Sequence, residues 1–173
     1  MTKSFYHDGG AEEIYLASTQ AGVTTSVALS ATQTGFTLTN PFGSGKTLVV
    51  LRVNDAFTTA PAGACPLTLT ANVNPVATAV VQTTPLTVRN ANLGVSGSGV
   101  GLAASSVTLP AASVVVRPLG GAVAASSITP PYINDDVNGE ICVAPGCALS
   151  INSVTTAAVA VLSMVWKEID EIA

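Results

Sequence analysis

One short segment of the chain has the residue types of a phosphate-binding loop. Residues 43–47 read Gly-Ser-Gly-Lys-Thr, and in a P-loop such residues hold phosphates through backbone N–H groups, the lysine and the hydroxyl. The motif also needs a glycine at position 40, where this chain has Asn40, and a helix directly afterwards. The residues that follow Lys46 are instead rich in valine and leucine, which favours a strand. We therefore expect a glycine turn and no nucleotide site.

A second segment has the oxygen ligands of a calcium loop. Residues 134–139 read Asn-Asp-Asp-Val-Asn-Gly, with oxygen-bearing side chains at alternate positions and glycine at the sixth. The twelfth position of such a loop is a bidentate glutamate, but it is Pro145 here, and the first is Asn134 instead of aspartate. We expect a solvated turn before a strand that starts at Ile141, with calcium binding by residues 134–138 as the alternative.

The three cysteines and the single histidine are the residues that could be combined as a zinc site. Cys65, Cys142, Cys147 and His7 could be combined as a zinc site, but four residues separate the last two cysteines, which is a loose spacing for that motif. We expect buried thiols instead of a metal centre or a disulfide framework. Thermal melts with and without calcium, and zinc analysis of the purified protein, test the two metal hypotheses.

Side chains for acid–base or nucleophilic catalysis are scarce. The only histidine is His7, and no serine lies in a Gly-x-Ser-x-Gly motif. The adjacent carboxylate pairs, at 12–13 and 135–136, point apart on a strand and are expected to be solvated. The sequence therefore predicts a protein that is not an enzyme, with no catalytic residue, no cofactor and no bound metal.

The composition points to a chain that associates with other subunits. Of the 173 residues 48 % are hydrophobic and 9 % are charged, whereas about 25 % charged is typical of soluble domains. The net charge is −4, and Arg89 and Arg117 are the only charges between residues 56 and 134, so no basic stripe could bind nucleic acid. Residues 157–166, the most apolar stretch, are too short to span a membrane. Residues 1–13 do not have the apolar core of a secretory signal, so synthesis in the host cytoplasm is expected.

The elements that would position these residues are short strands separated by Gly and Pro turns. Their spacing predicts an all-β chain, an antiparallel β-sandwich. The strands are expected at residues 46–57, 67–73, 113–118, 141–144, 148–153 and 158–169. Residues 94–104 are glycine-rich and are expected to form a long flexible loop.

Two strands carry explicit predictions of their faces. In residues 67–73, Leu67 and Leu69 should face a core while Thr68, Thr70 and Asn72 face water. In residues 46–57, the alternation puts Leu48, Val50 and Arg52 on one face and Val49, Leu51 and Val53 on the other. Residues 1–22 are expected to form an N-terminal arm or an edge segment, and residues 23–173 the sandwich domain.

Three stretches together carry a resemblance to a known group of proteins. They read NPFGSGKTLVVLRV from residue 40, LTVRNANLG from residue 86, and NGEICVAPGCALSINSVTTAAVAVLSMVWKEID from residue 138. Over residues 35–170 the pattern resembles the small jelly-roll structural proteins of tailed bacteriophages, known as virion, head-decoration or cement proteins. The resemblance implies a trimer of jelly rolls on the lattice of the major capsid protein, with no catalytic residues.

We therefore expect a non-enzymatic virion protein that binds the capsid exterior as a homotrimer and stabilises the head. Aromatic and aliphatic residues near the N-terminus are the candidates for docking on the capsid, because such side chains anchor interfaces: Phe5, Tyr6, Ile14, Tyr15 and Leu16. The alternative is that this segment is an edge strand completing the sandwich. For the whole chain, the alternative is a receptor- or carbohydrate-binding module of a head or tail fibre. The major capsid protein itself is disfavoured by the short chain.

Overall fold

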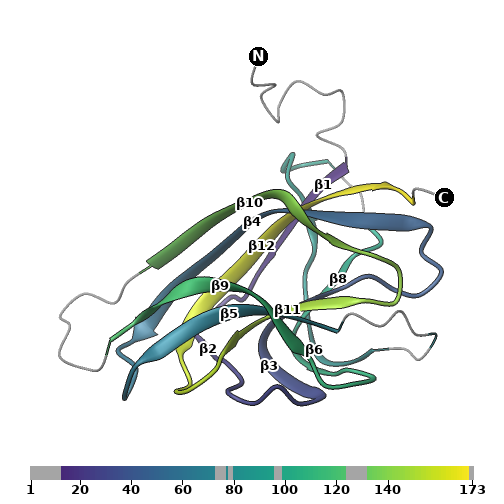
Figure 1. Ribbon diagram of the computed structural model, residues 1–173. Helices are drawn as coiled ribbons and strands as arrows, with labels where there is room; N and C mark the ends of the chain where they lie inside the picture. The colour runs from purple at the N-terminus through teal and green to yellow at the C-terminus, as the bar shows by residue number, and fades with distance from the viewer. Residues whose placement is uncertain (1–12, 73–76, 78–79, 96–98, 124–131, 172–173) are drawn as a thin grey trace.

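The structure is a computed structural model that describes residues 13–72, 77, 80–95, 99–123 and 132–171, which form two antiparallel sheets packed face to face (Figure 1). Sheet A has the order β10-β4-β12-β1-β7, with β2 also paired to β12, and sheet B has the order β6-β8-β3-β11-β5-β9. The strands of sheet A are β1 (Ile14–Ser18), β2 (Val23–Thr24), β4 (Lys46–Thr59), β7 (Arg89–Asn90), β10 (Tyr132–Val143) and β12 (Val159–Asp170). Those of sheet B are β3 (Thr32–Thr39), β5 (Cys65–Asn72), β6 (Val81–Leu86), β8 (Leu102–Thr108), β9 (Val114–Ala122) and β11 (Ala148–Ser153). The predicted all-β sandwich is confirmed.

The strand pairs are nested along the chain. β1 pairs with β12, β3 with β11, β4 with β10, and β5 with β9, all antiparallel. In this order, the four pairs lie in sheet A, sheet B, sheet A and sheet B. The chain therefore follows one long hairpin that is wound across both sheets. The pairs β12·β4 and β11·β5 join successive turns of this winding. β6 and β8 extend sheet B beyond β3, and β7 extends sheet A beyond β1.

Most predicted strands are confirmed, but the chain has more strands than expected. The six expected ranges fall in β4, β5, β9, β10, β11 and β12. Strands β3, β6 and β8 consist mainly of Thr, Gln, Ser and Ala, whose apolar periodicity is weak. The loop predicted for residues 94–104 is wrong at its end, because β8 begins at Leu102 and pairs with β3.

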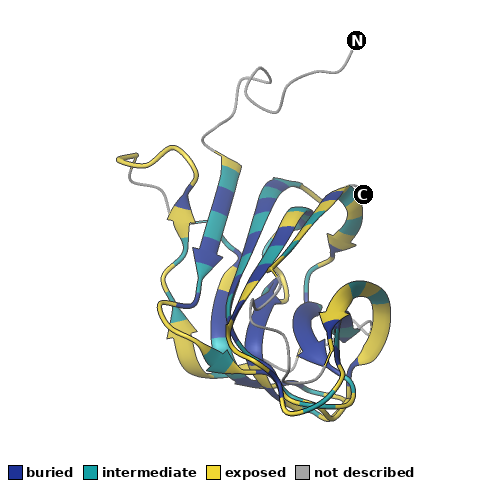
Figure 2. Cartoon of the chain, turned by 90° about the vertical axis from the view of Figure 1, so that its left-hand side faces the viewer, coloured by how far each residue is buried: buried dark blue, intermediate teal, exposed yellow. Residues whose placement is uncertain are grey.

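The core lies between the sheets and is centred on strand β12. Trp166, Met164 and Leu162 are buried and pack with Phe36 and Leu38 of sheet B. Burial alternates residue by residue along β12, and Figure 2 shows such banding of buried and intermediate positions on several strands. One side of this strand therefore belongs to the core and the other faces outward.

The water-exposed face predicted for β5 is wrong. Thr68, Thr70 and Asn72 are all buried, as well as the leucines on the other face. β5 is a central strand, and its hydroxyls join a hydrogen-bonded layer in which Asn152 of β11 donates to Thr70 Oγ1 over 2.9 Å and to Gln33 Oε1 over 2.6 Å. Buried polar groups are tolerated where such partners exist.

The predicted faces of β4 hold only for its first half. Leu48 and Val50 share one face, as expected, and are buried, but Val53 is also buried whereas Arg52 is exposed. The register with β12 shifts between Val50 and Arg52, which makes Leu51 an extra residue. A bulge of this kind moves every later side chain to the opposite face.

A buried carboxylate holds the segment before β8 against sheet A. Glu168 accepts hydrogen bonds from the backbone N–H groups of Val100 and Gly101, both 2.9 Å, and from Trp166 Nε1 at 3.2 Å. A Cβ at Gly101 would lie 2.9 Å from Trp166 Nε1, and a Cβ at Gly99 would collide with the Glu168 carboxylate. Glycine at both positions therefore permits the close approach.

Candidate interaction surface

The outer face of sheet A is mostly aliphatic. On β12 its residues are Val159, Val161, Ser163, Val165, Lys167 and Ile169, and on β1 they are Ile14, Leu16 and Ser18. All are half-buried, in contrast to the buried residues that alternate with them. An antiparallel sheet with one face in water usually carries polar side chains there. We call these nine residues, with the β4 and β10 residues in register beside them, the outer face of sheet A.

The charges on this face are few and largely paired. One row across the sheet runs Leu16, Val165, Arg52 and Asp136 from β1 to β10. Arg52 Nε lies 2.6 Å from Asp136 Oδ1, and both side chains are about half exposed. Another row across the sheet, which runs from Ile14 of β1 to Val49 of β4, contains Lys167 of β12. The face can therefore meet a partner without leaving many charges to be desolvated.

The structure separates the five candidate docking residues. Ile14 and Leu16 lie on the outer face of sheet A, whereas Tyr15 points into the core with its ring centroid 6.4 Å from that of Trp166. Phe5 and Tyr6 lie outside the described residues. Strand β1, which carries Ile14, Tyr15 and Leu16, pairs with β12 on one side and with β7 on the other. Docking through Ile14 and Leu16 stays a prediction.

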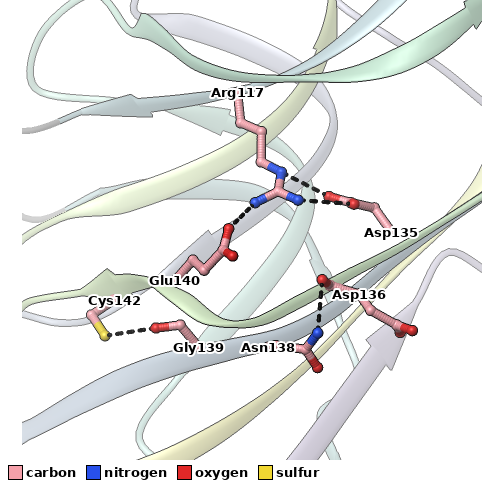
Figure 3. Close-up of polar contacts among 7 residues, drawn as sticks. All are labelled: Arg117, Asp135, Asp136, Asn138, Gly139, Glu140 and Cys142. Carbon is pink, nitrogen blue, oxygen red and sulfur yellow. Dashed lines mark hydrogen bonds and ion pairs between the residues drawn. The ribbon is translucent and has the colours of Figure 1, made fainter.

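An ionic cluster joins the two sheets along one edge of the sandwich, where β9 and β10 run side by side (Figure 3). Arg117 of β9 lies between two acids of β10: its Nε is 3.0 Å from Asp135 Oδ2, and its Nη1 is 2.5 Å from Glu140 Oε2. The hydrogen bond to Glu140 and the charge of Asp135 raise the pKa of Arg117, so the guanidinium is permanently charged. Charges at an edge strand also discourage pairing with further strands.

One of the calcium-like residues, Asp135, belongs to this cluster, and these residues do not form the separate turn expected. Residues 134–139 lie within β10, where a four-residue bulge sets Val137 in the core and leaves Asn138 and Gly139 with positive φ angles of 52° and 84°. Asp135 binds Arg117, while Asp136 binds Arg52 on the outer face. Asp135 and Asp136 are therefore bound to two different arginines, whereas a calcium site would need both carboxylates to face one ion.

The structure also shows where the phosphate-loop-like residues and the three cysteines lie. Residues 43–45 lie in the turn between β3 and β4, with φ of 73° at Gly43 and 67° at Gly45, and Lys46 and Thr47 begin β4, as expected. Cys65 is buried in β5, Cys147 is half-buried, and Cys142 is exposed on β10, so the expectation of buried thiols is wrong for Cys142. Burial raises the pKa of the Cys65 and Cys147 thiols.

The sequence analysis missed a buried acid. Asp55 of β4 is 3 % exposed, and neither of its carboxylate oxygens has a hydrogen bond of good geometry, although the backbone N–H of Ile133 lies on the facing strand. Burial raises the pKa of this carboxyl to about 7, against a small lowering by the Ile133 N–H. The spacing of Val53, Asp55 and Phe57 on one face of a strand was the available signal.

A small hollow lies beside the turn between β3 and β4. Its volume is about 220 Å³, and no charged side chain lines it among the residues that the structure describes; the lining includes Pro41, Phe42, Gln82 and Leu102. Phe42 is 60 % exposed at this turn. An exposed aromatic beside an uncharged hollow is a surface on which one small ring could rest.

Comparisons of the chain with known protein families, with curated protein sequences and with solved structures found no match. Within the described ranges, no three His, Cys, Asp or Glu side chains lie close enough together to hold a metal ion. The same part of the chain contains no helix that is long and apolar enough to cross a membrane.

Proposed function

We propose that the chain is a non-enzymatic structural protein of a phage virion, a head-decoration protein that binds the capsid exterior. The nested pairing of eight strands, β1 with β12 inward to β5 with β9, supports a fold of the jelly-roll type, in which two Greek keys share two sheets. Because one fold serves many functions, this support is an analogy with the family that the sequence resembles. The proposed function therefore rests on the surface residues of the two sheets.

The observation that carries the proposal is the aliphatic outer face of sheet A. Four of the six outward positions of β12 are Val159, Val161, Val165 and Ile169, where a sheet in contact with water alone would have polar residues. The paired charges of Arg52 and Asp136 leave this face close to neutral. A flat, weakly charged, aliphatic surface suits a permanent contact with a large partner, for which we propose the major capsid protein.

A separate apolar surface supports association between copies. Val114, Val115 and Val116 are all exposed at the start of β9, the edge strand of sheet B. The edge strand of sheet A beside it, β10, is instead protected by Asp135, Asp136 and a bulge. We propose that β9 contributes to the contacts of a homotrimer, so that the outer face of sheet A stays free for the capsid.

Analysis of virus particles tests the proposal. Particles made from the genome that encodes this chain are purified, and the chain is quantified by mass spectrometry against the major capsid protein. We expect many copies in a fixed ratio, and particles without the chain should assemble but rupture at a lower temperature. Absence of the chain from the particles would refute the proposal.

A matched pair of variants tests the docking surface. Val165→Lys places a charge in the middle of the outer face of sheet A, whereas Thr83→Lys places it on an exposed position of β6 in sheet B. Docking would bury the lysine charge without a partner, which costs about 1.5 kcal/mol or more, so Val165→Lys should weaken binding to chain-free particles at least about tenfold. Thr83→Lys should bind normally. Equal binding by both variants contradicts docking through sheet A.

The hollow beside Phe42 favours one alternative, a carbohydrate-binding module of a fibre. A sugar ring could stack on the exposed Phe42 ring within a space that has no charged lining. A glycan array probed with the wild-type chain and with Phe42→Ala distinguishes the two functions. Binding that is lost with Phe42→Ala, together with only a few copies per particle, would favour the fibre module.

A further inference from the structure

Asp55 lies on the inner face of sheet A, one strand from its edge. β10, the edge strand, places Ile133 opposite Asp55, and β12, a central strand, places Leu162 opposite it on the other side. The side chain is buried, and neither carboxylate oxygen has a hydrogen-bond partner of good geometry. A carboxylic acid can remain neutral at such a site, but a carboxylate needs donors or water.

Among the described residues, the groups that surround Asp55 offer no compensating positive charge. On β10 the nearest inward-facing acid is Asp135, which is paired with Arg117 of β9. From β5 the titratable neighbour is Cys65, whose thiol is neutral near pH 7 because burial raises its pKa. On β12 the neighbours on the inner face are Ala160, Leu162 and Met164, which do not ionise.

We propose that Asp55 is a proton-controlled latch, which holds the first half of β10 (residues 132–136) against β4 while it is neutral and releases it when it ionises. Water can reach the carboxylate most directly from the β10 side, because within the described part of the chain β10 has no neighbour beyond it in the sheet. The outward residues of this half-strand are already exposed, Tyr132 by 77 %.

The pH window follows from the pKa of Asp55. The carboxyl has a pKa of about 7 in the closed structure against 3.8 for an exposed aspartate, so the closed structure binds the proton more tightly. The stabilisation by the proton is complete below about pH 4 and is lost as the pH rises to about 7. The opening equilibrium should therefore increase about 50-fold between pH 5 and pH 7 and level off above that.

Hydrogen exchange of the full chain tests the latch. Amide protection of residues 132–136, corrected for the intrinsic pH dependence of exchange, should fall about 50-fold between pH 5 and pH 7 in the wild type. In Asp55→Asn, which cannot ionise, it should change little, whereas Asp170→Asn, at the exposed end of β12, should behave as the wild type does. Strand β11 in sheet B should keep its protection in all three proteins.

Two results would overturn the proposal. One is an equal loss of protection in wild type and Asp55→Asn, and the other is a loss spread evenly over β10 and β11, which would mean global destabilisation. Should Asp55→Asn fail to fold, titration of the Asp55 carboxyl carbon by NMR in the wild type decides. A midpoint near pH 4 refutes the latch, and a midpoint near pH 7 that coincides with changes in the amide signals of residues 132–136 supports it.

Discussion

Replacement of Glu168 by glutamine isolates the contribution of one buried carboxylate to the stability of the sandwich. Oε2 accepts from the Val100 N–H, and Oε1 accepts from the Gly101 N–H and from Trp166 Nε1. The carboxylate is 4 % exposed. In Glu168→Gln the amide oxygen can keep the two bonds made by Oε1, but the amide NH₂ then faces the N–H of Val100, and two donors oppose each other.

The cost of this change can be estimated from the bonds it removes. One hydrogen bond to a charged group is worth about 1.5 to 3 kcal/mol, and the Val100 N–H is left without an acceptor in a partly buried position. We therefore expect Glu168→Gln to lower the free energy of unfolding by about 3 kcal/mol. With a urea m-value of about 2 kcal/mol/M for a domain of this size, the midpoint should fall by about 1.5 M.

Urea denaturation followed by Trp166 fluorescence measures this shift directly, since the indole lies within the affected cluster. Asp170→Asn is the matched control: it is on the same strand, two residues further on, and its side chain is 90 % exposed. The control should leave the midpoint nearly unchanged. Equal midpoints for Glu168→Gln and the wild type would refute the assignment of Glu168 as the clamp on residues 100–101.

Further predictions concern the same core and the thiols. Gly101→Ala should lower stability by about 1 to 3 kcal/mol in urea denaturation, because its Cβ meets the fixed indole of Trp166; an unchanged midpoint would mean that this segment is loosely packed. Val137→Ala should cost about 1.5 to 3 kcal/mol in the same assay, because two buried carbons are lost and a cavity is left, and no loss would show that the β10 bulge does not close the core. Iodoacetamide at pH 8 should modify Cys142 within minutes and Cys65 only after unfolding. Mass spectrometry of tryptic peptides measures this order, and modification of Cys65 before Cys142 would contradict the prediction.

Local sequence patterns predicted the strands well where apolar residues set the period. Residues 158–169 were expected as a strand, and β12 spans Val159–Asp170, because valine and leucine there determine the strand whatever surrounds it. The faces were harder to predict. Thr68 and Thr70 alternate with leucine as on a solvated strand, but hydroxyl partners on neighbouring strands allow their burial. Such partners lie far away in sequence and leave no local signal.

The candidate surface depended on a similar non-local fact. Ile14, Tyr15 and Leu16 are one apolar run in the sequence, but the pairing of β1 with β12 divides it, with Tyr15 against Trp166 and the other two on the outer face. The same pairing adds Val161 and Val165 to that face. The aliphatic surface therefore consists of residues about 150 positions apart, and only the strand order brings them together.

The docking surface and the latch share strand β10, and this makes their relationship measurable. Asp136 and Tyr132 lie on the outer face of sheet A, in register with Arg52 and Ala56 of β4. A partner that binds the intact face must favour the closed position of β10, and by linkage its binding must make the latch harder to open. Exchange of residues 132–136 at pH 7 should therefore be slower in the particle-bound chain than in the free chain.

Asp55→Asn provides the control for this linkage. In that variant the free chain is already closed at pH 7, so binding to the particle should slow the exchange of β10 by a smaller factor than in the wild type. Identical exchange of β10 in free and bound wild-type chain would mean that the bound surface does not include β10. Docking would then have to be confined to β12 and β1, where Val165 and Leu16 lie side by side.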